Sequence, residues 1–251
     1  MSYINPLRAA WSRGEVARGA WGAAGSALTV EALAAVGFDY VGIDMQHGAV
    51  GYESALGMIS AVAGRGSVPI VRVAQNDQAL IGLMLDAGAL GVVVPMVNSA
   101  VEAAQAVAAC TYPPAGMRSY GPVRASVVTG SRVPADLEEV VCAVMVETVA
   151  GLAQLEEIAA VPGVDVIYVG PADLALSLGL PPAYERAEQQ HQDAVAQIRS
   201  VCDRFGLVAG IHCADGDMAS RRIEQGFRMV TFVNDLALLK EKAAEQLAVT
   251  R

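Results

Sequence analysis

The chain has 251 residues, a mass of 26.0 kDa, 54% hydrophobic residues and a formal net charge of −9 at pH 7. This length suits one large domain spanning residues 1–251, and the acidic balance argues against nucleic acid or an anionic membrane as a partner. Even one of the most apolar segments, Ala87 to Val97, is about half as long as the ~20 residues that a membrane helix needs.

Short apolar runs, typical of buried strands, alternate along the whole chain with amphipathic helical patterns. The predicted strands are Ala17–Gly22, Tyr40–Asp44, Pro69–Arg72, Leu90–Pro95, Val140–Val146, Val164–Val169, Leu207–Ile211 and Met229–Val233. The predicted helices are Ser26–Val36, Glu53–Val62, Asp77–Ala87, Ser99–Ala109, a segment carrying Leu152, Leu155 and Ile158, Ala183–Cys202, Asp217–Gln225 and a last helix from Asp235.

Eight strands alternating with helices predict a parallel (β/α)8 TIM barrel, an α/β fold. An open doubly wound sheet is the alternative, but no G-x-G-x-x-G motif follows the first strand. Between the fourth helix of the pattern and the fifth strand, Thr111 to about Ala135 forms a long connection rich in proline and glycine. A connection of this length inside a compact domain is usually functional or disordered.

Two carboxylates follow the fifth and sixth predicted strands. Glu147 comes directly after the run ending at Val146, and Asp173 follows the turn Gly170-Pro171-Ala172, 26 residues later (173 − 147). Acids at the mouths of neighbouring parallel strands suit a divalent metal with positions left for water and substrate. The alternative, that both acids only cap helices, is equally compatible with the spacing.

Other polar residues stand at the ends of the remaining strands. Asp44 ends the second strand with His47 three residues on, Arg72 ends the third, and His212 follows the seventh. In a barrel these positions converge on one mouth, where active sites of this fold lie. Each has a simpler reading, since Arg72 could be a structural ion pair for Asp44 and a lone histidine is more often a packing or surface residue. His191, in a polar helical segment, is expected to be solvated.

The cysteines and the N-terminus suggest a reducing compartment. Cys110, Cys142, Cys202 and Cys213 show no C-x-x-C spacing, which favours buried thiols over disulfides or zinc. Met1-Ser-Tyr-Ile-Asn-Pro lacks the basic flank and apolar core of a signal peptide. We therefore expect a cytoplasmic protein.

In combination, these residues resemble a known family. Its motifs are seen in Gly42-Ile-Asp44-Met-Gln-His47-Gly, Val71-Arg72, Val94-Pro95-Met96-Val97, Tyr112-Pro-Pro-Ala-Gly-Met-Arg118, Glu147-Thr148 and Gly170-Pro-Ala-Asp173-Leu174. They are similar to the HpcH/HpaI-type class II, metal-dependent pyruvate aldolases, which include 4-hydroxy-2-oxoheptanedioate and 2-dehydro-3-deoxyglucarate aldolases. The match runs in order from about Gly19 to the last helix.

The resemblance implies a carbon–carbon lyase that cleaves or forms 4-hydroxy-2-oxo acids from an aldehyde and pyruvate, or a related 2-oxo acid such as hydroxypyruvate, through a metal-stabilised enolate. It implies Glu147 and Asp173 as ligands of Mg²⁺, Mn²⁺ or Co²⁺, and Arg72 as the partner of the keto oxygen. It also implies Asp44 as the residue that orients Arg72, His47 as part of the base system, and a backbone cradle for the pyruvate carboxylate. That cradle consists of Gly170, Pro171, Ala172 and Asp173.

The chemistry agrees with the residue types, because charge that develops on the C2 oxygen needs an electron sink. The other common sink is a lysine Schiff base, yet Lys240 and Lys242 lie in the final helix, away from any strand end. This absence favours the metal route independently of the resemblance.

Three positions depart from the family pattern or pose a puzzle. Met145 stands where close members carry glutamine. His212 stands at a position that is apolar in them, and it is expected to contact the far end of the substrate or the aldehyde. Asp86 matches an acid that pairs with the base histidine, but it ends a helix that runs away from the mouth. We expect it to serve a neighbouring subunit.

The resemblance further implies a homohexamer, a trimer of dimers that exchange their C-terminal helices. The sequence supports this through the apolar stripe Leu236, Leu239, Ala243 and Leu247. Two alternative functions stay open: an acyl-CoA lyase of the citrate lyase or malyl-CoA type, and a barrel that binds an oxo acid without catalysis.

Overall fold

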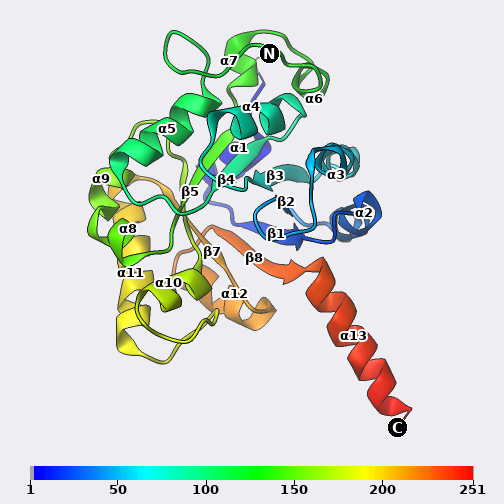
Figure 1. Cartoon of the computed structure of the whole chain (residues 1–251), viewed down its shortest axis with the longest axis vertical. Coiled ribbons are helices and arrows are strands. Elements are labelled where there is room, and N and C mark those ends of the chain that lie inside the picture. The colour runs from blue at the N-terminus through cyan, green and yellow to red at the C-terminus, as the bar shows by residue number, and fades with distance from the viewer. Residues whose placement is uncertain (1–2, 251) are drawn as a thin grey trace.

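Eight parallel strands form a closed barrel in the computed structural model, which describes residues 3–250 (Figure 1). The strands are β1 (Ala17–Gly22), β2 (Tyr40–Asp44), β3 (Val68–Arg72), β4 (Gly91–Val94), β5 (Val141–Val146), β6 (Val166–Val169), β7 (Val208–His212) and β8 (Met229–Asn234). Each strand pairs with the next along the chain, and β8 pairs with β1 to close the barrel. The predicted (β/α)8 barrel is confirmed.

Helices surround the barrel between the strands. They are α1 (Pro6–Ser12), α2 (Ala27–Val36), α3 (Tyr52–Gly64), α4 (Gln78–Asp86), α5 (Ala100–Cys110), α6 (Ala125–Thr129), α7 (Pro134–Leu137), α8 (Val149–Ala153), α9 (Leu155–Ala159), α10 (Pro171–Ser177), α11 (Gln189–Phe205), α12 (Gly216–Glu224) and α13 (Asp235–Val249). No helix within residues 3–250 is long and apolar enough to cross a membrane.

Several predicted helices differ from those in the structure. The helix predicted from Ala183 begins only at Gln189, and the predicted helix after Glu147 is two short helices that meet at Gln154. The long connection after α5 contains the short helices α6 and α7. Helix α1 and helix α10, which begins at Pro171, were not predicted.

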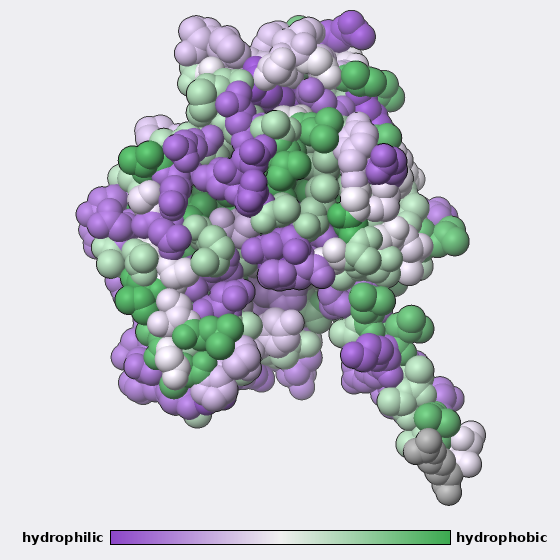
Figure 2. All heavy atoms as spheres, in the orientation of Figure 1, coloured by the Kyte–Doolittle hydropathy of each residue, from purple (hydrophilic) through white to green (hydrophobic). Residues whose placement is uncertain are grey.

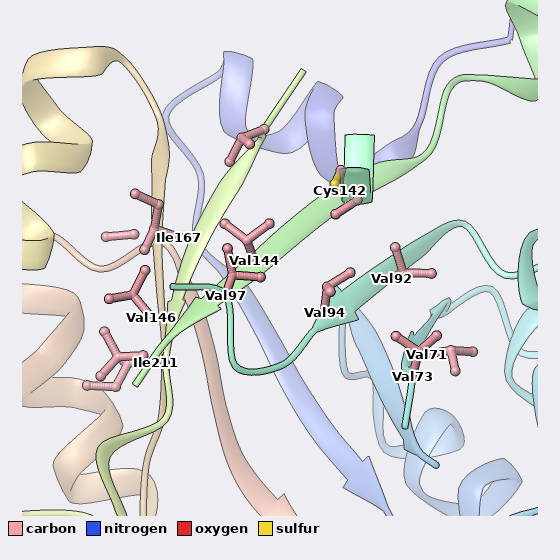
Figure 3. Close-up of a cluster of buried hydrophobic side chains, with 14 of the residues drawn as sticks. Val71, Val73, Val92, Val94, Val97, Cys142, Val144, Val146, Ile167 and Ile211 are labelled. Atoms are coloured by element: carbon pink, nitrogen blue, oxygen red, sulfur yellow. The ribbon is translucent and has the colours of Figure 1, made fainter. Parts of the chain in front are cut away.

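Most strand residues are buried on both faces of the sheet, with the exposed Arg18 of β1 an exception, and this explains the nearly continuous apolar runs. In β5, Cys142, Val144 and Val146 point outward and pack under the helices (Figure 3), whereas Met145 points into the barrel. Because side chains alternate along a strand, Glu147 continues the inward-pointing series. The same parity directs Asp44, Arg72 and His212 inward at the ends of their own strands.

Large aromatic side chains fill the barrel below the site. The hydroxyl groups of Tyr40 and Tyr168 each lie 2.7 Å from Oγ1 of Thr231, so the buried polar groups are paired within the core. A Cβ atom at position 19 would lie 2.1 Å from the Tyr40 ring, and one at position 42 would lie 2.2 Å from the Trp21 ring. Gly19 and Gly42 are therefore the residues that admit these rings.

The C-terminal helix α13 departs from the barrel instead of packing along it (Figure 1). It carries exposed leucines, including Leu236, Leu239 and Leu247, and Figure 2 shows apolar residues along its length.

The four cysteines are all free and buried, as predicted.

Candidate active site

A cavity of about 350 Å³ opens at the carboxyl ends of the strands. It brings together most residues singled out in the sequence, including the Asp44, His47 and Arg72 group and His212. The complete lining consists of Trp21, Ala23, Asp44, His47, Arg72, Met145, Tyr168, Gly170, Pro171, Ala172, Asp173, Tyr184, His212, Asn234 and Leu236.

Asp44 and Arg72 form a two-pronged ion pair on adjacent strands. They are register partners in β2 and β3, and Nε and Nη2 of Arg72 donate to the two Asp44 oxygens at 2.9 and 2.6 Å. Burial alone would raise the pKa of Asp44, but the hydrogen bonds and charge of Arg72 lower it below its usual value. The guanidinium carbon also lies 5.3 Å from the centre of the Trp21 ring. Arg72 is therefore a fixed cation at the mouth, and the predicted orienting contact from Asp44 is present.

The Glu147 carboxylate is buried beneath the cavity, with its side chain 1% exposed. Oε1 accepts a 2.9 Å hydrogen bond from the backbone N–H of Met96, whose φ of 57° is a left-handed conformation that is uncommon outside glycine. Oε2 has no hydrogen-bond partner among the described residues. Burial, and to a smaller extent the negative charge of Asp173, raise the pKa of Glu147 to about 7.

Asp173 lies in the first turn of α10 and lines the cavity. Position 170, at the start of this turn, has room only for glycine. A Cβ atom there would lie 2.0 Å from Oε2 of Glu147 and 2.8 Å from the methyl carbon of Met145. The turn that carries Asp173 therefore packs directly against the Glu147 carboxylate.

These two acids fit a hard divalent cation. The unpartnered, buried Oε2 of Glu147 and the nearby Asp173 offer the oxygen ligands that Mg²⁺ and Mn²⁺ prefer. Within residues 3–250, no three His, Cys, Asp or Glu side chains gather into a closed metal cluster. A cation at this place would have two protein ligands and open positions for water or substrate.

His47 and Asp86 lie far from each other in the fold. His47 is on the loop after β2, where its backbone N–H donates to Asp44 at 3.2 Å and its side chain lines the cavity. Asp86 ends α4, which runs back toward the other end of the barrel, and its Oδ1 accepts a 2.9 Å hydrogen bond from the buried Arg118. As expected, Asp86 is not part of its own chain's cavity. Burial raises its pKa, partly offset by Arg118.

The ring of His212 lies between two aromatic side chains. Its centroid is 5.4 Å from that of Trp21, in an edge-on arrangement, and 5.3 Å from that of Tyr184, in a stacked one. Burial and the positive charge of Arg72 lower the pKa of His212 to about 4, although Asp44 opposes this. The imidazole is therefore neutral around pH 7.

His191 was wrongly predicted to be solvated. It is 1% exposed, and its Nε2 lies 3.0 Å from the carbonyl oxygen of Pro171, behind the turn that carries Asp173. The signal was present in the sequence, because His191 shares one face of α11 with Ala194, Val195 and Ile198 at spacings of three, four and seven residues.

Other site residues also escaped the sequence analysis. Trp21 has the inward parity of β1 and could have been identified from it. Tyr184 could not, because its segment was taken for a helix. Nothing in the local sequence indicates the positive φ of Met96.

Comparison with known proteins agrees with this geometry. A family model described as HpcH/HpaI aldolase/citrate lyase matches residues 18–241. A hydroxypyruvate/pyruvate aldolase of Rhizorhabdus wittichii is 38% identical over 249 residues, covering 99% of each chain. A 4-hydroxy-2-oxo-heptane-1,7-dioate aldolase of Escherichia coli is 35% identical, covering 97% of this chain and 94% of the relative. The crystal structure of an HpcH/HpaI aldolase/citrate lyase family protein from Burkholderia cenocepacia superposes with a TM-score of 0.91 at 32% identity, covering 99% of this chain and 100% of that chain.

The buried Glu147 carboxylate predicts a characteristic pH dependence of stability. Because its folded pKa of about 7 lies above the usual value of 4.5, the folded state binds the extra proton, and stability is lost as pH rises from about 4.5 to 7. In chelator, Glu147→Gln should therefore gain stability relative to the parent between pH 5 and pH 8, by on the order of 3 kcal/mol.

The measurement is the free energy of urea unfolding of both proteins across this pH range. Added Mg²⁺ or Mn²⁺ should shrink the advantage of the variant at pH 8, since a bound cation stabilises the ionised carboxylate. A difference between the two proteins that does not change with pH would contradict the assignment.

Proposed function

This chain belongs to the HpcH/HpaI aldolase/citrate lyase family and is an aldolase, and from this premise we propose how its residues act. The reaction is the cleavage or formation of 4-hydroxy-2-oxo acids, with an aldehyde as one partner and pyruvate or hydroxypyruvate as the other. The observation that carries the proposal is the convergence of Asp44, Arg72, Glu147 and Asp173 at one end of the barrel.

The proposed metal ligands are Glu147 and Asp173, supported by the unpartnered Oε2 of Glu147 and by the contact of Gly170 with that carboxylate. A divalent cation, Mg²⁺, Mn²⁺ or Co²⁺, would supply Lewis-acid chemistry at the C2 oxygen when bound. The backbone from Gly170 to Asp173 would hold the 2-oxo acid carboxylate. His191 would support this turn through its contact with Pro171.

Arg72 would add a fixed positive charge where negative charge develops on the keto oxygen. Its two hydrogen bonds to Asp44 hold the guanidinium in one orientation, so little reorganisation is needed during the reaction. A donor of this kind contributes a factor of roughly 10²–10³ to the rate.

His47 would belong to the base system that removes the proton of the 4-hydroxyl group. Its side chain lies at the cavity, and its loop is held by Asp44. Asp86 would act in the same proton path from a neighbouring subunit, toward His47 of the partner subunit, because it lies outside its own chain's cavity.

We also propose a closed homo-oligomer, a hexamer made of three dimers that exchange α13, in the cytoplasm. The exposed leucines of α13 and its departure from the barrel support the exchange, and the buried free thiols support a reducing compartment. Light scattering should give a mass several times 26.0 kDa. A monomer that is active at nanomolar concentration would contradict the exchange.

Two substitutions should separate the electron sink from the base. Aldol cleavage needs both, whereas decarboxylation of oxaloacetate needs the sink but no base for a 4-hydroxyl proton. Arg72→Ala should suppress both reactions. His47→Ala should lower kcat/KM for aldol cleavage by roughly 10²–10⁴-fold while leaving much of the decarboxylation.

The measurement is kcat/KM for both reactions in the parent and in each variant. Equal losses in the two reactions for His47→Ala would mean that the histidine organises the site without acting as the base.

A further inference from the structure

One side of the cavity, which we call the β7/β8 wall, consists of Tyr184, His212 and Asn234. His212 ends β7 and Asn234 ends β8. Tyr184 comes from residues 181–188, between α10 and α11, and stacks on the His212 ring with 19° between the ring planes. The proposed metal ligands follow β5 and β6, so this wall faces the part of the cavity that the 2-oxo acid does not need.

The β7/β8 wall offers hydrogen-bonding groups that the protein itself does not use. Oδ1 of Asn234 accepts from the backbone N–H groups of Leu236 and Ala237, both at 3.1 Å, so the amide is oriented with its NH₂ group as the remaining donor. No ring nitrogen of His212 makes a hydrogen bond to any residue in 3–250. A neutral imidazole, as its lowered pKa requires, offers one donor and one acceptor.

The charge around the cavity is unfavourable for a second anion. Arg72 is the only lysine or arginine among the lining residues within 3–250, and its Nε and Nη2 both donate to Asp44. Its third nitrogen, Nη1, is left for the keto oxygen of the 2-oxo acid. Asp173 also lines the cavity, and Glu147 lies beneath it. A terminal carboxylate on the aldehyde would lose its hydration on entering the cavity without forming an ion pair with a positively charged side chain, and this desolvation is costly.

The segment that carries Tyr184 is anchored to α12. Oε2 of Glu185 accepts from Arg221 at 2.7 Å, and Oε1 lies 3.5 Å from Nη2 of the buried Arg222. The residue next to the stacked tyrosine is therefore fixed on the outside of the barrel. The Tyr184 ring is held as part of the cavity by this anchor together with the stack.

We infer that the β7/β8 wall binds the aldehyde partner and selects an uncharged, hydroxyl-bearing aldehyde, with Tyr184 and His212 as the specificity-determining pair. The inference rests on the proposed aldolase function and names the substrate class of that site. Hydroxyl groups on the aldehyde would pair with His212, Asn234 and the Tyr184 hydroxyl, whereas an alkyl aldehyde would leave these groups unpaired. A site built on hydrogen bonds rejects analogues that lack them.

The test compares three aldehydes with pyruvate as the common partner: glyceraldehyde, propanal and succinic semialdehyde. Glyceraldehyde and propanal share a three-carbon chain and differ in hydroxyl groups, whereas succinic semialdehyde ends in a carboxylate. The parent should prefer glyceraldehyde by about tenfold or more in kcat/KM over each of the other two. Equal or greater kcat/KM with propanal or succinic semialdehyde would overturn the inference.

Variants assign the preference to the wall. His212→Leu and Tyr184→Phe should each lower the glyceraldehyde-to-propanal ratio of kcat/KM by about threefold or more, as expected when a substrate hydroxyl loses its partner. His212→Lys should raise the relative kcat/KM for succinic semialdehyde. Tyr52→Phe, on the exposed side of α3, is the matched control and should leave the ratio unchanged.

Ratios measured on one preparation cancel any loss of folded enzyme, so a poorly folding variant still gives a usable result. Unchanged ratios in both His212→Leu and Tyr184→Phe would overturn the assignment of the wall. If the parent condensed none of the aldehydes with pyruvate, the proposed function itself would be overturned, and this inference with it.

Discussion

The buried Glu147 carboxylate is the constraint on which the rest of the site depends. An ionised carboxylate without water is unfavourable unless it is paired, yet one oxygen of Glu147 has no hydrogen-bond partner within residues 3–250. Two neighbouring features accommodate this carboxylate. The left-handed backbone of Met96 directs an N–H at Oε1, and the lack of a side chain at Gly170 leaves room for Oε2. Backbone strain of this kind is kept where the surrounding structure fixes it, often at functional sites. A divalent cation beside Glu147 and Asp173 would remove the imbalance.

The mouth of the barrel divides its chemistry among three groups of strands. The acids follow β5 and β6, the Asp44–Arg72 pair ends β2 and β3, and the uncharged β7/β8 wall covers a third side. Trp21 connects the second and third of these groups, since its ring lies beside both the Arg72 guanidinium and the His212 ring. One end of the cavity is therefore suited to stabilising negative charge, and another to recognising neutral polar groups.

The sequence was sufficient for the fold because strands buried on both faces leave unmistakable apolar runs, and because parity then directs Asp44, Arg72 and Glu147 inward. It was insufficient where tertiary contacts decide local structure. The segment before Gln189 reads as helix, but the Tyr184 stack and the Glu185 ion pairs hold it in another conformation. Likewise, the polar neighbours of His191 concealed its burial, although its helical spacing to Ile198 indicated it.

The central claim, that Glu147 and Asp173 hold a divalent cation at the mouth, is tested most directly by a Mn²⁺ titration followed by electron paramagnetic resonance. The account predicts one bound Mn²⁺ per chain. Glu147→Gln and Asp173→Asn should each weaken its Kd by at least roughly tenfold, whereas Asp193→Asn on the outer face of α11 should not change it. Pyruvate added to the parent should alter the spectrum of the bound ion. Mn²⁺ binding of equal affinity in the parent and in both site variants would contradict the account.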